Sequence, residues 1–157
     1  MKHLNLESAL RAIESDQRVF VHGGAATPKT LLSGMVQEAH RLKNVELLHL
    51  HLEGPIEYVK PNLAASFRSA SLFVGSNLRS HLDFDRVDYI PAFLSEMPQL
   101  IRSGRRPIDV ALVHVSKPDR HGFCTLGVSV DIARAAVDSA RVVIAQVNPR
   151  MPRIHGD

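Results

Sequence analysis

The sequence predicts an α/β fold in which helices flank a mostly parallel sheet. Short apolar runs rich in β-branched residues alternate with longer amphipathic stretches, and several of the runs are apolar on both faces. Strands of a parallel sheet are covered on both faces, so they need such continuous apolar runs. With 157 residues, 45% of them hydrophobic and 22% charged, the chain has the size and composition of a single globular domain spanning 1–157.

Six runs are expected to form strands: 19–22, 45–52, 72–75, 88–93, 109–115 and 142–147. Apolar residues at helical spacing predict a helix over 31–42, with Thr27 as its N-cap and Pro28 at its first position. A second helix is expected over 133–140, where small residues favour close packing on a sheet. Acidic residues interrupt the apolar pattern of 1–16, which predicts an amphipathic helix instead of a signal peptide.

The composition narrows the possible locations and partners. Cys124 is the one cysteine, so no intrachain disulfide can form and a reducing, cytoplasmic location is expected. No apolar run approaches the roughly 18 residues of a membrane span, so no membrane partner is expected. The net charge is only +3, Trp is absent, and Arg105-Arg106 is the one adjacent basic pair. Nucleic acid is therefore not an expected partner, because it would require a basic stripe.

Several predicted strands end in loops that carry Gly, Pro, Asn, Asp or His, and open parallel sheets bind ligands beyond these strand ends. Gly23 and Gly24 lead directly into the helix start near Pro28. Glycines let backbone N–H groups approach a phosphate or carboxylate, which the positive end of a helix also attracts. A tight turn without a ligand explains the same residues equally well. The turn matches neither the GxGxxG pattern nor the P-loop pattern.

Nine histidines raise the hypothesis of a metal site. His49 and His51 are two residues apart and would share one strand face, while His22 and His114 lie at strand ends. No HExxH or CxxC motif accompanies them. The favoured interpretation is that these histidines form hydrogen bonds at the sheet edge, and no metal ion is expected.

No catalytic nucleophile or acid–base pair is evident from the residues alone. Ser76 follows Gly75 but lacks the second glycine of a GxSxG motif. Cys124 is interpreted as a small packed side chain and Glu96 as a solvated or helix-start acid. Asp131 lies near a helix start, where the helix dipole alone favours a carboxylate.

Three segments are similar, in order and spacing, to signatures of one family. Segment 89–104 begins YIPAFLSEMP and resembles YIP-x-FLSE-x-P. Segment 109–131 resembles a strand and loop of the form VSPPD-x-HG-x-x-SLG-x-SVD, and segment 147–157 resembles VNP-x-MPR-T-x-GD. With the Gly-Gly-to-Pro turn, the resemblance to the acetyl-CoA hydrolase and transferase family spans nearly the whole chain. The chain departs from this pattern at three positions. Lys117 stands where the family has Pro, Thr125 where it has Ser, and Ile154 where it has Thr.

The resemblance implies that the chain is the Rossmann-like N-terminal half of a class I CoA-transferase, with the C-terminal catalytic half absent. Family members move CoA between a short acyl-CoA and a carboxylate of the acetate or 4-hydroxybutyrate type, or hydrolyse acetyl-CoA. They use a glutamate of the C-terminal half, which forms a mixed anhydride and then a glutamyl-CoA thioester. Accordingly, no catalytic residue is expected in this chain. Coenzyme A is expected as a substrate, and no cofactor is expected.

The resemblance also suggests that this half supplies one wall of the substrate pocket. We expect Gly23, Gly24 and Ala25 after the first strand, and Gln146 and Asn148 at the end of the last strand, to bind or orient the acyl or acceptor carboxylate. A role in shaping the turns alone is the alternative.

The expected protein partners are the C-terminal half of the enzyme and further copies of it in a homo-oligomer. The isolated chain is expected to be inactive and to expose an apolar docking face. Two other functions stay open: a non-catalytic subunit or binding module of a two-chain CoA-transferase, and a His-dependent metal enzyme.

Overall fold

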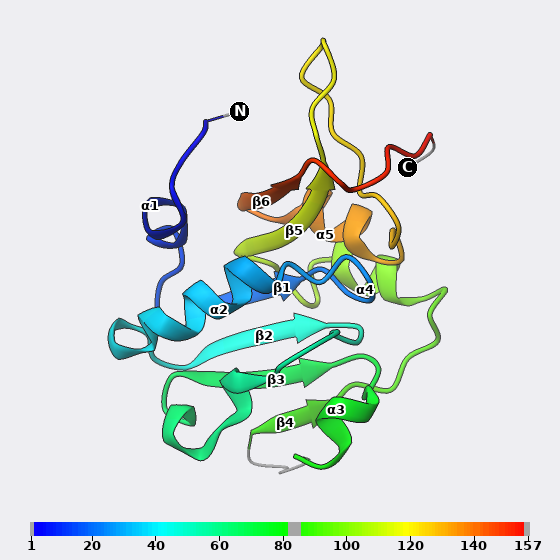
Figure 1. Cartoon of the computed structure of the whole chain (residues 1–157). Helices are drawn as coiled ribbons and strands as arrows, with labels where there is room; N and C mark the ends of the chain where they lie inside the picture. The colour runs from blue at the N-terminus through cyan, green and yellow to red at the C-terminus, as the bar shows by residue number, and fades with distance from the viewer. Residues whose placement is uncertain (1, 82–85, 156–157) are drawn as a thin grey trace.

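The computed structural model describes residues 2–81 and 86–155. The described residues form one six-stranded sheet with the order β4-β3-β2-β1-β5-β6, in which every neighbouring pair is parallel (Figure 1). The predicted α/β fold with a parallel sheet is confirmed. The strands are β1 (Arg18–Val21), β2 (Val45–His49), β3 (Phe67–Ser71), β4 (Val87–Tyr89), β5 (Val110–Ser116) and β6 (Val142–Asn148).

Helices cover both faces of the sheet, with α2 on one side and α4 and α5 on the other (Figure 1). The α-helices are α1 (Leu6–Leu10), α2 (Lys29–Gln37), α3 (Ser76–Arg79), α4 (Met97–Arg102) and α5 (Ala133–Ser139), and short 3-10 turns cover Glu38–Arg41, Glu57–Val59 and Pro61–Leu63. No helix in the described ranges combines the length and the apolar character that crossing a membrane requires.

The central strand β1 shows why both faces need apolar residues. Val19 and Val21 pack into the cluster shared with α1 and α2, whereas Phe20 packs into the cluster shared with α4 and α5. All three side chains are fully buried. Burying one such side chain stabilises the fold by about 1.5–3 kcal/mol, so the alternation along β1 joins the two layers.

Two of the expected strands are placed differently in the structure. The prediction of a strand over 72–75 was wrong, because β3 lies five residues earlier, at Phe67–Ser71. Ser69 and Ser71 made this stretch look polar, yet both are fully buried and hydrogen-bonded. The strand expected over 88–93 is only Val87–Tyr89, because Pro91 has no N–H to continue the ladder.

The helix starts also differ from expectation. The N-terminal helix is shorter than 1–16 and begins after Asn5, whose side chain accepts the Ser8 N–H at 2.8 Å. Thr27 does not cap α2 and Pro28 precedes its first residue, so both predictions were wrong. The Thr27 hydroxyl instead donates to the Gly24 carbonyl at 2.7 Å and accepts the Glu53 N–H at 2.9 Å.

Candidate functional site

The strand order creates a switch point between β1 and β5. From β1 the chain moves outward through β2, β3 and β4, then returns to place β5 on the other side of β1. Ligands of open α/β sheets bind beyond the carboxyl ends of the strands at such a point. In this chain the glycine turn after β1 and the loop after β5 meet there, so this edge is the candidate site.

The glycine turn is held between two loops from elsewhere in the chain. Gly24 has a φ of +55° and donates its N–H to the His51 carbonyl at 2.9 Å. A Cβ at Gly24 would lie 2.9 Å from the Ser129 Oγ, and one at Gly23 would lie 3.0 Å from the His51 carbonyl oxygen. Both glycines are therefore needed for close packing. Ala25, at the tip of the turn, is exposed, and within the described residues its N–H has no hydrogen-bond partner.

The start of α2 is closed by a side chain from β6. Gln146 Oε1 accepts the N–H groups of Thr30 at 3.2 Å and Leu31 at 3.4 Å. These groups would otherwise be the free donors of the helix start. Gln146 thus links α2 to β6. Two of the N–H groups at the start of α2 that could have bound an anion already have Gln146 as their acceptor.

Asn148, the other residue expected at the end of β6, also forms a local bond. Its Oδ1 accepts the Arg150 N–H at 2.9 Å, and its carbonyl accepts the Met151 N–H at 3.0 Å. Asn148 pairs with Ser116 in the sheet register, so the turn that it shapes lies beside the end of β5.

Two neutral histidines lie at the switch point. His22 is fully buried, and its Nδ1 accepts the His114 backbone N–H at 3.2 Å. This bond leaves Nε2 protonated, and Nε2 donates to the Ser129 carbonyl. Burial lowers the pKa of His22 and also that of His114, so both rings are neutral near pH 7. His22 holds the Ser129 loop in place, and neither ring adds positive charge to the site.

Asp131 completes the far side of the glycine turn. Its Oδ1 accepts the Ile132 and Ala133 N–H groups at the start of α5, which confirms its expected position at a helix start. Its Oδ2 lies 3.5 Å from the position of a Cβ on Gly23. Asp131 has a φ of +34°, so its backbone is strained while its side chain satisfies the helix.

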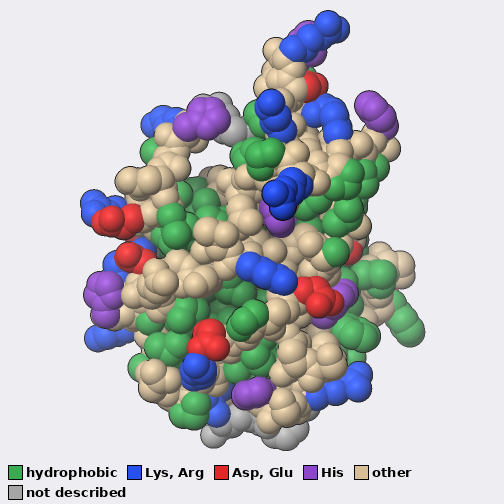
Figure 2. Space-filling model, viewed as in Figure 1, with side chains coloured by type: hydrophobic (Ala, Val, Ile, Leu, Met, Phe, Trp, Pro, Cys, Tyr) green, Lys and Arg blue, Asp and Glu red, His purple; other side chains and the backbone are tan. Residues whose placement is uncertain are grey.

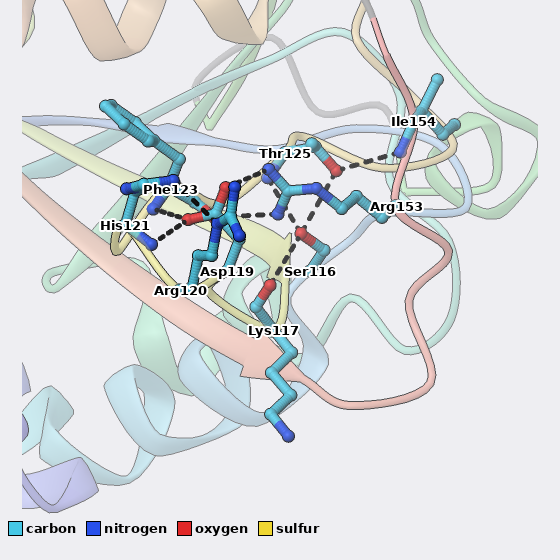
Figure 3. Close-up of polar contacts among 9 residues, drawn as sticks. All are labelled: Ser116, Lys117, Asp119, Arg120, His121, Phe123, Thr125, Arg153 and Ile154. Atoms are coloured by element: carbon cyan, nitrogen blue, oxygen red, sulfur yellow. Dashed lines mark hydrogen bonds and ion pairs between the residues drawn. The ribbon is translucent and has the colours of Figure 1, made fainter.

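The loop after β5 projects from the body of the protein, as Figure 1 shows in yellow. Asp119 organises its tip, because Oδ1 accepts the N–H groups of His121 and Phe123, both at 2.9 Å. Arg153, from the C-terminal segment, donates to Asp119 Oδ2 and to the Phe123 carbonyl, also at 2.9 Å (Figure 3). These bonds hold Phe123 in solvent with 68% of its surface exposed. Lys and Arg side chains follow the same projection in Figure 2.

The remaining histidines do not gather into a metal site. Across residues 2–81 and 86–155, no three His, Cys, Asp or Glu side chains lie close enough together to hold an ion. His49 is buried with its Nε2 2.8 Å from the Ser69 Oγ, whereas His51 lies beyond β2 against the Phe73 ring. The two rings therefore do not share a ligand position.

The carboxyl ends of β3 and β4 carry exposed apolar side chains. Phe73 follows β3 and Tyr89 ends β4, while Phe93 and Leu94 lie in the next loop; 52–77% of each residue's surface is exposed. Glu96 lies just before α4 and accepts the Phe93 N–H at 3.4 Å, so it is a helix-start acid. Cys124 is half-buried, and burial raises the pKa of its thiol.

Sequence reasoning missed Ser129 and Arg153. Ser129 contacts the glycine turn from the loop before α5, and Arg153 crosses 34 positions to reach Asp119. Neither contact leaves a local pattern in the sequence.

Comparison with known families and proteins agrees with the fold and the motifs. The family of the acetyl-CoA hydrolase/transferase N-terminal domain matches residues 1–157. The chain is 44% identical over 147 residues to the succinyl-CoA:acetate/propanoyl-CoA:succinate CoA transferase of Fasciola hepatica, a match that covers 92% of this chain and 30% of that protein. It is 38% identical over 156 residues to the 4-hydroxybutyrate coenzyme A transferase of Clostridium kluyveri, a match that covers 99% of this chain and 36% of that protein.

A solved structure shows the same architecture. The crystal structure of RipA from Yersinia pestis superposes with a TM-score of 0.88 at 26% identity, over 98% of this chain and 38% of that one. The chain spans about a third of the length of the relatives that it matches. The full-length family match, the shared fold and these identities together place the chain in the acetyl-CoA hydrolase/transferase family, as an N-terminal domain.

Proposed function

We propose that this chain is the N-terminal part of an enzyme that moves CoA between a short acyl-CoA and a carboxylate of the acetate or 4-hydroxybutyrate type. The observation that carries the proposal is the position of the glycine turn at the β1/β5 switch point, in a chain that matches the family's N-terminal domain along its whole length. The names of the two relatives support this substrate class. The glutamate that attacks the thioester belongs to the part outside this chain.

In this proposal the turn presents backbone donors to a substrate carboxylate. Ala25 is exposed and its N–H is the free donor, while Gly23 and Gly24 let the turn pack closely against His51 and Ser129. A hydrogen bond from a backbone N–H to a carboxylate contributes about 1.5–3 kcal/mol. Gln146 and Asn148 act one step further back, because their oxygens hold α2 and the turn after β6. The neutral His22 keeps this wall rigid without competing for the anion.

Exposed apolar side chains support a second half that packs on this side of the sheet. Phe73, Tyr89 and Phe93 lie at the carboxyl edge, and Phe73 packs against His51, which borders the glycine turn. In the intact enzyme such residues are covered by protein, and the isolated chain leaves them in water. The isolated chain therefore lacks turnover in this proposal.

Two measurements test the proposal. Acyl-CoA hydrolysis and CoA transfer are assayed with the purified 157-residue chain and with the intact enzyme; turnover is expected only from the intact enzyme, and robust turnover by the chain would refute a nucleophile located elsewhere. In the intact enzyme, Ala25→Pro removes the free N–H while Ala25→Ser keeps it. Only the proline variant should raise the KM for the carboxylate, by about tenfold or more, with the KM for the acyl-CoA unchanged. Equal carboxylate KM values for the two variants, at matched Tm, would remove this role of the turn.

A further inference from the structure

The outer edge of β6 carries backbone donors without partners. Val142 donates its N–H to the Asp109 carbonyl next to β5 at 3.0 Å. Backbone groups alternate along a strand, so the N–H groups of Val143, Ala145 and Val147 point away from β5. Within the described ranges no hydrogen bond to these three groups is found outside the sheet ladder. β6 is therefore an open edge with three free donors.

The composition of β6 offers no protection for this edge. Its seven residues read VVIAQVN and include no charge and no proline. Val143 has 42% of its surface exposed and Val147 has 37%. Natural sheets blunt their edges with charges, proline, bulges or very short strands. The opposite edge obeys this rule, because β4 has only three residues and includes Asp88.

Hollows flank β6 on both faces. One, of about 450 Å³, is bounded by β6 on one side and by Lys2–Leu4 with α1 on the other. Figure 1 shows this N-terminal segment standing beside β6. The second, of about 340 Å³, has walls from β5, from Val137 of α5 and from Cys124. A strand added to β6 would place its side chains, alternately, in the two hollows.

Charges at the two ends of β6 define the partner. Arg141 precedes the strand with 80% of its side chain exposed and pairs with Asp109 at 3.4 Å, and Arg150 follows the strand, also exposed. A second copy of β6 in antiparallel pairing would bring Arg141 of one copy close to Arg150 of the other. Like charges placed opposite each other destabilise a strand pair. A segment with carboxylates at its ends matches this edge instead.

We propose that β6 is a strand acceptor, which binds an extended, apolar segment with acidic ends from the part of the polypeptide that the full-length relatives have in addition to this chain. Those relatives are about three times as long as the matched region. The inference rests on the proposed function only in that it treats this chain as part of a longer enzyme. The added strand makes main-chain bonds to the three free donors and fills the hollows with alternate side chains.

Hydrogen exchange of individual amides tests the proposal. The 157-residue chain is compared with a hybrid in which it replaces the matched part of the Clostridium kluyveri relative. In the chain alone, Val143, Ala145 and Val147 should exchange rapidly, while Ile144 and Gln146, which donate toward β5, stay protected. In the hybrid all five amides should be protected, and the three outward ones should slow by about 100-fold or more.

Variants separate strand pairing from general stabilisation. Ala145→Pro removes one outward N–H and leaves the ladder to β5 intact, so in the hybrid it should return Val143 and Val147 to fast exchange. If that variant does not fold, Val143→Lys, which places a cation in the hollow beside the strand, should have the same effect.

Two results would overturn the proposal. The first is unchanged exchange at the three outward amides in a folded hybrid. The second is concentration-dependent protection of the same amides in the 157-residue chain, with a dimer in the ultracentrifuge, because a second copy would then be the occupant. Catalysis does not enter this readout. A hybrid that turns over substrate with unprotected amides refutes the strand acceptor alone, and an inactive hybrid with protected amides refutes only the proposed function.

Discussion

Acidification should destabilise the fold through His49. This side chain is 1% exposed on β2, its Nδ1 lies 3.2 Å from the Leu50 carbonyl, and its Nε2 lies 2.8 Å from the Ser69 Oγ. The carbonyl accepts from Nδ1–H, so Nε2 is the acceptor of the Ser69 hydroxyl in the neutral ring. Burial, the largest cause, lowers the pKa of His49 to about 4 from its ordinary value of 6.5. A proton added to Nε2 would reverse the direction of the Ser69 bond and leave a positive charge on a buried ring.

The sign and size of the change in stability follow from the difference between the folded and unfolded pKa values of His49. Because the folded pKa is below the unfolded one, the stabilisation is complete above the unfolded pKa and is lost as the pH falls toward about 4. The complete effect is about 3 kcal/mol, and about 2 kcal/mol should be lost between pH 7.5 and pH 5. That range lies above the pKa values of most carboxylates.

Urea unfolding at the two pH values measures the loss. His49→Gln, which does not titrate, serves as the comparison. His22 and His114 also have lowered pKa values and contribute with the same sign, so the decisive quantity is the difference between the two proteins. The free energy of unfolding of His49→Gln should depend on pH less steeply by about 2 kcal/mol over this range. Equal pH dependence in both proteins would refute the assignment of a buried, neutral His49.

Three further predictions concern the site. Gly24→Ala should lower the free energy of unfolding by about 1–3 kcal/mol in chemical denaturation. Adding Ser129→Ala should restore the part of this loss that comes from the steric clash and leave the part that comes from the positive φ. No recovery in the double variant would contradict the 2.9 Å contact. Asp119→Ala should speed amide exchange at His121 and Phe123, with unchanged rates in β5; unaffected loop amides would argue against Asp119 as the organiser of the tip. Cys124 should be alkylated by iodoacetamide near pH 8 more slowly than free cysteine, because burial raises its pKa; equal or faster labelling would contradict this.

The segments that form the candidate site were largely predictable from the sequence. The glycine turn, the loop after β5 and the end of β6 each follow an apolar run, and a parallel sheet brings such strand ends to one edge. The family signatures added the identity of the domain, which the family match confirms. Local patterns were sufficient here because strand ends and turns are local features.

Contacts between distant segments were not predictable in this way. Gln146 was expected to face a ligand, but Oε1 caps α2 from 116 positions away. Ser69 and Ser71 interrupt the apolar pattern that predicts a buried strand, yet both hydroxyls are hydrogen-bonded inside the fold, so their burial carries little cost. In each case the partner that decides the role of the residue lies in another part of the chain.

The pairing of β1 with β5 has a consequence for synthesis on the ribosome. Val19 of β1 pairs with Val110 of β5. The ribosome therefore completes β1, β2, β3 and β4 before it makes β5, the strand that covers the second edge of β1. Until then a strand with three consecutive buried apolar residues, Val19 to Val21, presents an open backbone edge at what becomes the centre of the sheet. Pausing of translation before Asp109 would prolong that exposure, and the nascent chain would depend most on chaperones during this interval.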